Sequence, residues 1–165
     1  MDRLKTKRLL AFLLAFAAAG LASGTLLGLM LKGAQLYSGH QVYRLLLNTD
    51  YIPVLNRVRL DEATEFGIHL VISALLCMVL GLLWQKRARR KVLSTSEMMF
   101  VTALIGGIVG LLLYPTTMLS AGGTPPIDSL PAWGWWLAAH LLYGAASGLL
   151  LRVILLAQNL QAKNK

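Results

Sequence analysis

The chain has 165 residues, of which 56% are hydrophobic and 14% charged, and a composition this apolar excludes an ordinary water-soluble domain. The net charge of +9 does not indicate nucleic-acid binding, because the basic residues lie between apolar runs and form no stripe interleaved with aromatic residues. Four apolar runs are long enough to cross a bilayer. The sequence therefore predicts an all-α, polytopic membrane four-helix bundle in which residues 1–165 form a single transmembrane domain.

The first run, residues 9–31, contains no ionisable side chain and predicts the first span. The basic residues before it also fit a cleaved signal peptide, but the run is longer than such a peptide needs, which favours an uncleaved anchor. Three glycines recur every fourth residue on one face of this helix: Gly20, Gly24 and Gly28. Such a stripe predicts close helix packing inside the bundle or, alternatively, a contact in a homo-oligomer.

Residues 32–65 predict a long outside loop between the first two spans, because they mix aromatic residues, leucines and charges without a spanning run. We expect short amphipathic elements in the membrane interface, broken between Asn48 and Pro53. The second span, residues 66–84, follows. Polar and small residues form one seam at four-residue spacing along it: Glu65, His69, Ser73, Cys77 and Gly81.

A basic connection, residues 85–97, is predicted to be cytoplasmic, and Ser94 and Glu97 within it have the spacing of a capping box. The third span, residues 98–119, carries two packing glycines, Gly106 and Gly110.

Prolines close the third span and set the turn that follows: Pro115, Pro125, Pro126 and Pro131. Asp128 is expected to cap or hydrogen-bond this turn. An aromatic belt at the outer interface is then predicted from Trp133, Trp135 and Trp136. The segment therefore predicts a turn that returns the chain into the membrane, and nothing in it requires catalysis.

The fourth span, residues 133–156, carries a second histidine, His140, followed at four-residue spacing by Gly144, Gly148 and Arg152. Both histidine-bearing spans are predicted to enter from the outside, so the two rings are expected in the outer half of the membrane, facing the bundle interior. A proton-sensitive or polar bundle site is predicted from six residues: Glu65, His69, Ser73, His140, Tyr143 and Arg152. The alternative is that two neutral imidazoles only hydrogen-bond between helices.

Most lysines and arginines lie at the two termini and in residues 85–97, so both termini are predicted to be cytoplasmic. The single Cys77 excludes an intramolecular disulfide, and the histidines lack the spacing of a metal site. No cofactor or metal is expected. No phosphate loop, zinc-protease motif or nucleophile elbow is present, so the sequence predicts no enzyme.

Three stretches have a familiar order: "GLASGTLLGLMLKGA", "FGIHLVISALL" and "YPTTMLSAGGTPPIDSLPAWGWWLAAHLLYGAASGLL". With them the chain resembles the YagU/YqhR-type family of small bacterial inner-membrane proteins, from about Leu9 to Leu151. The resemblance rests on the following positions: His69, Pro115, Pro125, Pro126, Asp128 and His140. It implies a multi-pass protein of the bacterial cytoplasmic membrane, without established enzymatic activity, in a family linked to acid tolerance. The outside loop does not share in the resemblance.

Three functions remain open at this point. The first is a non-enzymatic membrane protein, structural or stress-related, that acts as a packed bundle or a homo-oligomer. The second is a proton-linked permease or channel-like oligomer that uses the intramembrane histidines. The third is a lipid-directed enzyme with the outside loop as a lid, for which a nucleophile would have to meet Glu65, His69 and Asp128.

Overall fold

The structure is a computed structural model that describes residues 3–55, 58, 60–88 and 90–163. The regular structure of these residues is helical throughout, in the order α1 (Arg3–Ser38), α2 (Val42–Leu47), α3 (Glu62–Ala88), α4 (Thr95–Leu113), the 3-10 helix η2 (Tyr114–Leu119) and α5 (Leu130–Lys163). Four segments are long and apolar enough to cross a membrane: Leu9–Ser38, Glu62–Ala88, Thr95–Leu119 and Leu130–Gln158. The predicted all-α class with four apolar spans is confirmed.

The helices extend beyond the apolar runs that predicted them. α1 continues to Ser38, past the predicted end at Leu31, and α3 begins at Glu62 instead of Phe66. Hydropathy marks only the segment suited to hydrocarbon, whereas backbone hydrogen bonding continues the helix into the interface. The connection between the first two spans is therefore residues 39–61, shorter than the predicted 32–65.

The start of α3 is fixed by a local hydrogen bond. The Asp61 carboxylate accepts a hydrogen bond from the Thr64 backbone N–H at 2.7 Å, as an N-cap side chain does. This bond holds the pKa of Asp61 below its usual value. At α4 the predicted capping pair is observed in part, since the Ser94 hydroxyl accepts from the Glu97 N–H at 3.0 Å.

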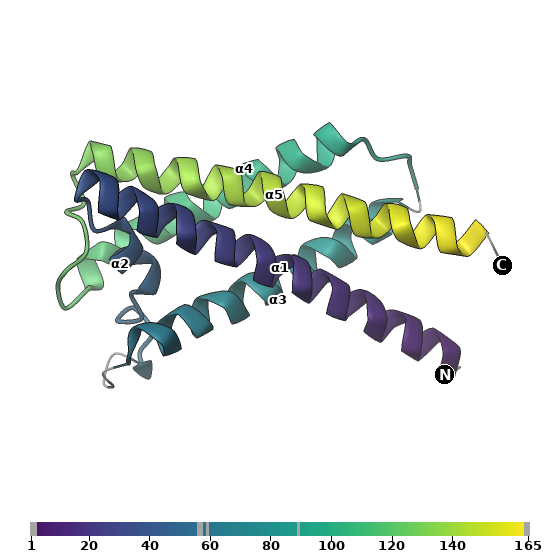
Figure 1. Cartoon of the computed structure of the whole chain (residues 1–165), viewed down its shortest axis with the longest axis horizontal. Coiled ribbons are helices and arrows are strands. Elements are labelled where there is room, and N and C mark those ends of the chain that lie inside the picture. The colour runs from purple at the N-terminus through teal and green to yellow at the C-terminus, as the bar shows by residue number, and fades with distance from the viewer. Residues whose placement is uncertain (1–2, 56–57, 59, 89, 164–165) are drawn as a thin grey trace.

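α1 and α5 form the centre of the bundle. α1 packs against α3 on one side and α5 on the other, and α5 packs along the length of α4 (Figure 1). The backbones of α3 and α4 make few close contacts with each other. Both chain ends and the α3–α4 connection lie at one end of the bundle, which we call the terminal end; α2 and the loop before α5 lie at the other, the α2 end (Figure 1).

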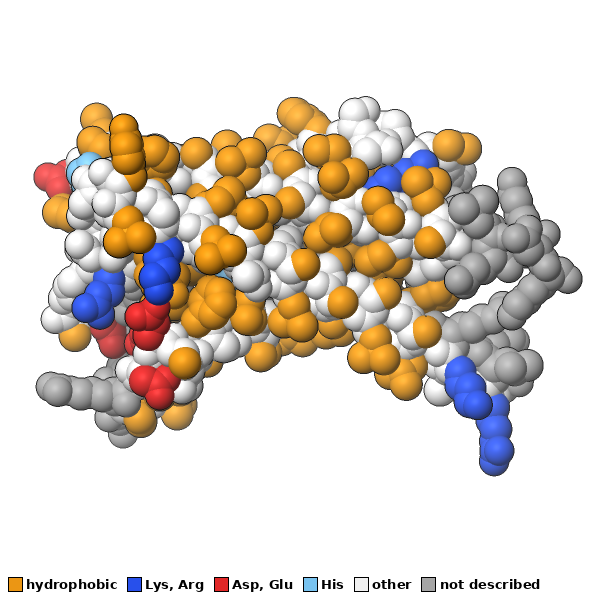
Figure 2. Space-filling view, in the orientation of Figure 1, with side chains coloured by type: hydrophobic (Ala, Val, Ile, Leu, Met, Phe, Trp, Pro, Cys, Tyr) orange, Lys and Arg blue, Asp and Glu red, His pale blue; other side chains and the backbone are white. Residues whose placement is uncertain are grey.

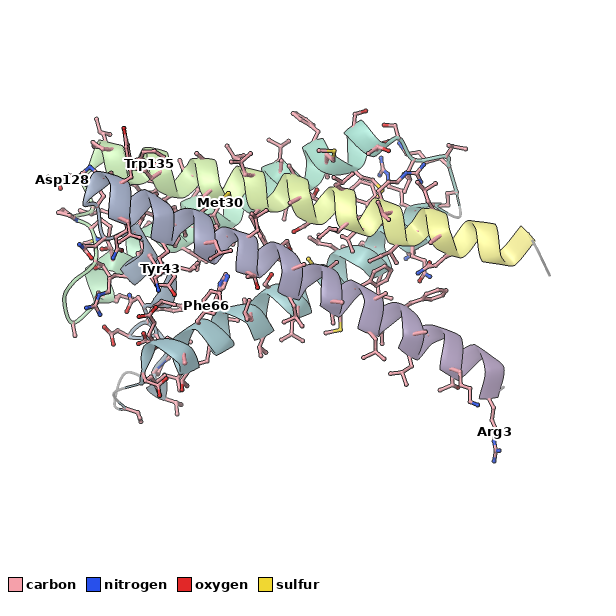
Figure 3. The ribbon with its side chains drawn as sticks, viewed as in Figure 1. Arg3, Met30, Tyr43, Phe66, Asp128 and Trp135 are labelled. Atoms are coloured by element: carbon pink, nitrogen blue, oxygen red, sulfur yellow. The ribbon has the colours of Figure 1, made fainter. Side chains whose placement is uncertain are left out.

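Side chains are distributed along this long axis as a membrane protein requires. Apolar side chains cover the middle of the visible face, and the acidic side chains seen there gather at the α2 end (Figure 2). Residues far apart in sequence lie toward the α2 end, including Tyr43, Phe66 and Asp128, whereas Arg3 lies at the far end of α1 (Figure 3).

Glycines allow the helices to approach closely. A Cβ added at Gly20 would lie 2.5 Å from the Ser73 carbonyl oxygen, and one at Gly24 would lie 2.8 Å from the Ser73 side chain. Gly28 faces the Phe66 ring in the same way. The whole stripe of α1 is therefore occupied by α3 of the same chain.

The α4–α5 contact is built from glycines on both helices. Gly106 lies against the His140 carbonyl and Gly144, and Gly110 lies against the His140 ring. In return, Gly144 faces the Thr102 carbonyl, and Gly148 faces the Thr102 hydroxyl. This interlocking explains why α5 follows α4 more closely than any other pair.

Two predictions need correction, one for Trp136 and one for Pro131. Trp136 is not an interface anchor: it is 2% exposed, and its indole N–H donates to the Gly110 carbonyl at 2.8 Å. The Gly110 carbonyl also accepts the Tyr114 backbone N–H, and its second lone pair holds the indole ring inward. Pro131 does not close the third span but lies in the first turn of α5, where a missing N–H costs nothing.

The turn before α5 is held by other groups than the one predicted. Pro115 lies at the start of η2, where the α-helix gives way to 3-10 geometry. The Tyr114 hydroxyl donates to the Pro126 carbonyl at 3.1 Å, and the Thr117 hydroxyl donates to the Pro125 carbonyl. Asp128 is exposed at the tip of the molecule (Figure 3) and makes no hydrogen bond within the described residues.

Trp133 and Trp135 remain near the surface. The Trp133 ring is half-buried and stacks on Tyr114 with ring centroids 3.8 Å apart, and its N–H donates to the Ile127 carbonyl. Trp135 is exposed beside Tyr37, with ring centroids 6.2 Å apart. These two residues have the exposure that an aromatic belt requires.

Candidate functional site: a polar cavity at the α2 end

A cavity of about 80 Å³ lies inside the α2 end of the bundle. Five of the six predicted polar site residues line it: Glu65, His69, Ser73, His140 and Tyr143. A cavity of this size can hold several water molecules but no metabolite of ordinary size. The arrangement follows from two helical repeats, since the first three residues recur every fourth residue on α3 and the last two lie one turn apart on α5.

Each histidine uses one ring nitrogen to bind a backbone carbonyl. His69 Nε2 lies 3.1 Å from the Gly24 carbonyl oxygen of α1, and His140 Nδ1 lies 2.9 Å from the Trp136 carbonyl oxygen. Carbonyl oxygens only accept, so these two nitrogens carry the hydrogen atom. The other nitrogen of each neutral ring is then free to accept a proton, and no hydrogen bond occupies it within the described residues.

The two rings differ in their surroundings. His140 is 2% exposed, packed beside Trp136 with ring centroids 4.3 Å apart and next to the gap at Gly110. His69 is half-buried, near the Phe66 ring at 5.8 Å. His140 is therefore the more deeply buried of the two rings that line the cavity.

Buried hydroxyls continue from the cavity toward the middle of the bundle. The Ser73 hydroxyl donates to the Gly20 carbonyl at 2.7 Å, which leaves its oxygen to accept from the Tyr143 hydroxyl at 2.9 Å. Further along, the Ser147 and Ser23 hydroxyls are 2.9 Å apart, and Ser23 lies 3.9 Å from the Cys77 sulfur. These groups make a polar interior in the half of the bundle next to the cavity.

The other half of the bundle is mostly apolar. A cluster of buried residues lies there, including Phe16, Trp84, Met98 and Leu151. None of these buried residues lines the cavity, so the cavity does not extend through the terminal half.

Arg152 does not belong to the cavity. It follows His140 by about three helical turns along α5, toward the terminal end, which is roughly 18 Å at 1.5 Å per residue. Its Nε is buried, with no hydrogen-bond partner in the part of the chain described. Four-residue steps fall slightly more than one helical turn apart, so over twelve residues Arg152 is also rotated about 120° from His140 around the α5 axis.

The connection between α1 and α3 covers the cavity and supplies residues that the sequence did not single out. Asn48, Thr49 and Tyr51 line the cavity, and so does Thr116 of η2, whose carbonyl accepts a hydrogen bond from the Asn48 side chain at 3.4 Å. Burial raises the pKa of Tyr51, so this residue contributes a neutral hydroxyl. For these lining residues the sequence signalled only the break after residue 47. Whether a loop residue is buried depends on which other segments pack against it, and the sequence pattern does not show that.

This cover is fastened to three parts of the bundle. The Gln35 side chain of α1 accepts hydrogen bonds from the Tyr43 and Arg44 N–H groups at 3.1 and 3.2 Å, and so caps α2. The Tyr43 hydroxyl donates to Glu62 of α3 at 3.2 Å. Asp50 accepts from the Ala121 N–H at 2.7 Å.

The cavity is least enclosed between α3 and α4. Its residues from α1 and α5, such as Leu27, Trp136 and Tyr143, are buried, whereas Ile72 of α3 is 46% exposed. Val109 of α4, on the opposite wall, is half-buried. This asymmetry agrees with the small number of close backbone contacts between α3 and α4.

No family model, curated protein or solved structure matches the chain. The resemblance to the YagU/YqhR-type family thus stays a prediction from short motifs. Within the described residues, no three His, Cys, Asp or Glu side chains are grouped to hold a metal ion.

Proposed function

We propose that the chain is a non-enzymatic, proton-linked permease of the bacterial cytoplasmic membrane, and that His69 and His140 bind the transported proton. The observation that carries this proposal is that the two rings line one cavity, each with a nitrogen left to accept. Glu65, at the rim, is a second group able to exchange protons with the cavity. The small volume favours protons or a very small solute over a metabolite.

The proposed orientation puts both termini in the cytoplasm and the cavity toward the outside. Its support is the charge distribution: the basic residues of the α3–α4 connection lie at the terminal end, whereas Asp50, Asp61, Glu62 and Glu65 lie at the α2 end. Because the cavity does not extend through the terminal half, transport requires a second conformation or an oligomer that opens that half.

The proposal can be tested by measuring proton flux driven by a pH gradient, in liposomes loaded with a pH-sensitive dye. We expect the native chain to carry protons faster than empty liposomes, and the His69→Gln/His140→Gln variant to lose most of this flux while keeping its helical circular dichroism. His40→Gln is the matched control, because His40 lies outside the cavity lining, and it should retain the flux. A native chain no faster than empty liposomes, or a folded double variant with full flux, would show the proposal to be wrong.

A second candidate, a structural or stress-related bundle, is favoured by a different observation. Both histidines already hydrogen-bond backbone carbonyls, and the His69 bond joins α3 to α1. In that case the double variant lowers the melting temperature, because the His69 bond joins two helices and such a bond contributes ~1 kcal/mol in a membrane, and no form of the chain carries protons.

A further inference from the structure

A second hollow lies between α3 and α4, at the terminal end, away from the histidine cavity. It has a volume of about 370 Å³, within the range of ligand sites of about 300 to 1,000 Å³. Its walls are apolar and come from both helices: Leu80, Leu83 and Trp84 on α3, and Val101 and Ile105 on α4. It exists because α4 presents its glycines to α5 and leaves its larger side chains toward α3.

Three basic residues line the end of this groove: Lys86, Arg87 and Arg90. Arg87 is held in place, since it binds Glu97 at 3.0 Å and lies over the Trp84 ring at 5.8 Å. Lys91 binds the same Glu97 oxygen at 2.7 Å, so both ion pairs of this carboxylate are made to residues other than Lys86 and Arg90.

Lys86 and Arg90 are left without partners. Both are exposed, and neither side chain makes an ion pair or a hydrogen bond within the described residues. The mouth of an apolar groove therefore carries two uncompensated positive charges, at the level where an apolar span meets its polar flank.

This combination selects one kind of occupant. Acyl chains suit the apolar walls, and a phosphate suits the cations, because arginine binds phosphate oxygens with two parallel hydrogen bonds. Basic pockets between spans are sites for anionic lipid head groups. A soluble anion would leave the apolar walls without a partner, and a second copy of the chain would bring the same cations together.

We propose that the groove binds one anionic phospholipid of the surrounding bilayer, with an acyl chain against Leu80, Val101 and Ile105 and its phosphate at Lys86 and Arg90. The Trp84 and Arg87 pair forms the boundary between the two parts of the lipid. This site shares no residue with the histidine cavity and does not depend on proton transport.

Trp84 provides the readout. The protein is placed in phosphatidylcholine vesicles that contain a rising fraction of phosphatidylglycerol with brominated acyl chains, and bromine quenching of tryptophan fluorescence is followed. Brominated phosphatidylcholine at the same fraction is the comparison. The other three tryptophans lie at the α2 end, and the Trp84→Phe variant measures their contribution for subtraction.

We expect Trp84 to be quenched at a much lower fraction of the anionic lipid than of the zwitterionic lipid. Lys86→Gln/Arg90→Gln should reduce this preference about thirtyfold. The reason is that each basic residue near an anionic membrane surface contributes about 1 kcal/mol, and two such contributions correspond to that factor. Arg3→Gln/Lys7→Gln is the matched control, because it removes the same charge from exposed positions at the same end and should keep the preference.

Three results would overturn the proposal. The first is equal quenching of the native chain by both lipids. The second is an equal loss of preference in both double variants, which would assign it to general surface charge. The third is no quenching of Trp84 by either lipid together with a dimer mass in native mass spectrometry, which would assign the groove to a second copy of the chain.

Discussion

At the scale of single residues, packing in this bundle depends on where a side chain is missing. Two of the glycines in α1 differ in the space around them. Gly20 lies against the backbone of Ser73 and Ala74, with 2.5 Å left for a Cβ, whereas Gly33 has nothing within 4 Å of that position. Backbone atoms cannot move aside as the end of a flexible side chain can, so the two sites should respond differently to the same added methyl group.

We expect Gly20→Ala to destabilise the protein by about 1–3 kcal/mol, the usual cost of overfilling a packed interface. Gly33→Ala should be neutral or stabilising by up to about 1 kcal/mol, because alanine favours helix and meets no neighbour there. Reversible unfolding in mixed micelles of a mild detergent and SDS measures both. Equal stability of the two variants would mean that α1 and α3 are farther apart than this structure has them.

At the scale of elements, the short helix α2 matters because it carries the cover of the cavity. Six residues cannot form a stable helix alone. Its own N-cap residue, Gln41, makes no capping hydrogen bond, and Gln35 of α1 supplies the acceptor instead. The cover is therefore fastened through one side chain that belongs to a different helix.

Gln35→Ala should release α2 without disturbing the four spans. Loss of a cap costs about 1 kcal/mol, so amide hydrogen exchange in residues 42–47 should accelerate roughly fivefold. Gln41→Ala is the matched control, because the Gln41 side chain bonds only its near neighbour Gly39. Unchanged exchange after Gln35→Ala, or equal acceleration in both variants, would show that the apolar contacts of Val42 and Leu45 alone hold α2.

At the scale of the whole molecule, the sequence predicted what depends on local spacing and missed what depends on which surfaces meet. Apolar run length was enough for four spans, and the four-residue repeat was enough to put Glu65, His69 and Ser73 on one face. The inward position of Trp136 depends on a carbonyl group of another helix, that of Gly110. The lining by Asn48 and Thr49 depends on how the connection folds back, and no periodicity records that.

The placement of the two ends across a membrane is a prediction from charge that cysteine labelling can check in intact cells. Cys77 is 0% exposed, so the native chain should not react with a maleimide that cannot cross the membrane. Ala121→Cys adds an exposed thiol at the α2 end, and Ser96→Cys adds one at the terminal end. With both termini cytoplasmic, the first should be labelled from outside and the second only after the membrane is permeabilised.

The reverse pattern would invert the orientation, put the histidine cavity on the cytoplasmic side, and assign Lys86 and Arg90 to the outer leaflet. Labelling of both thiols from one side would mean that the long axis of the bundle does not cross the bilayer, because the two positions lie at opposite ends of it.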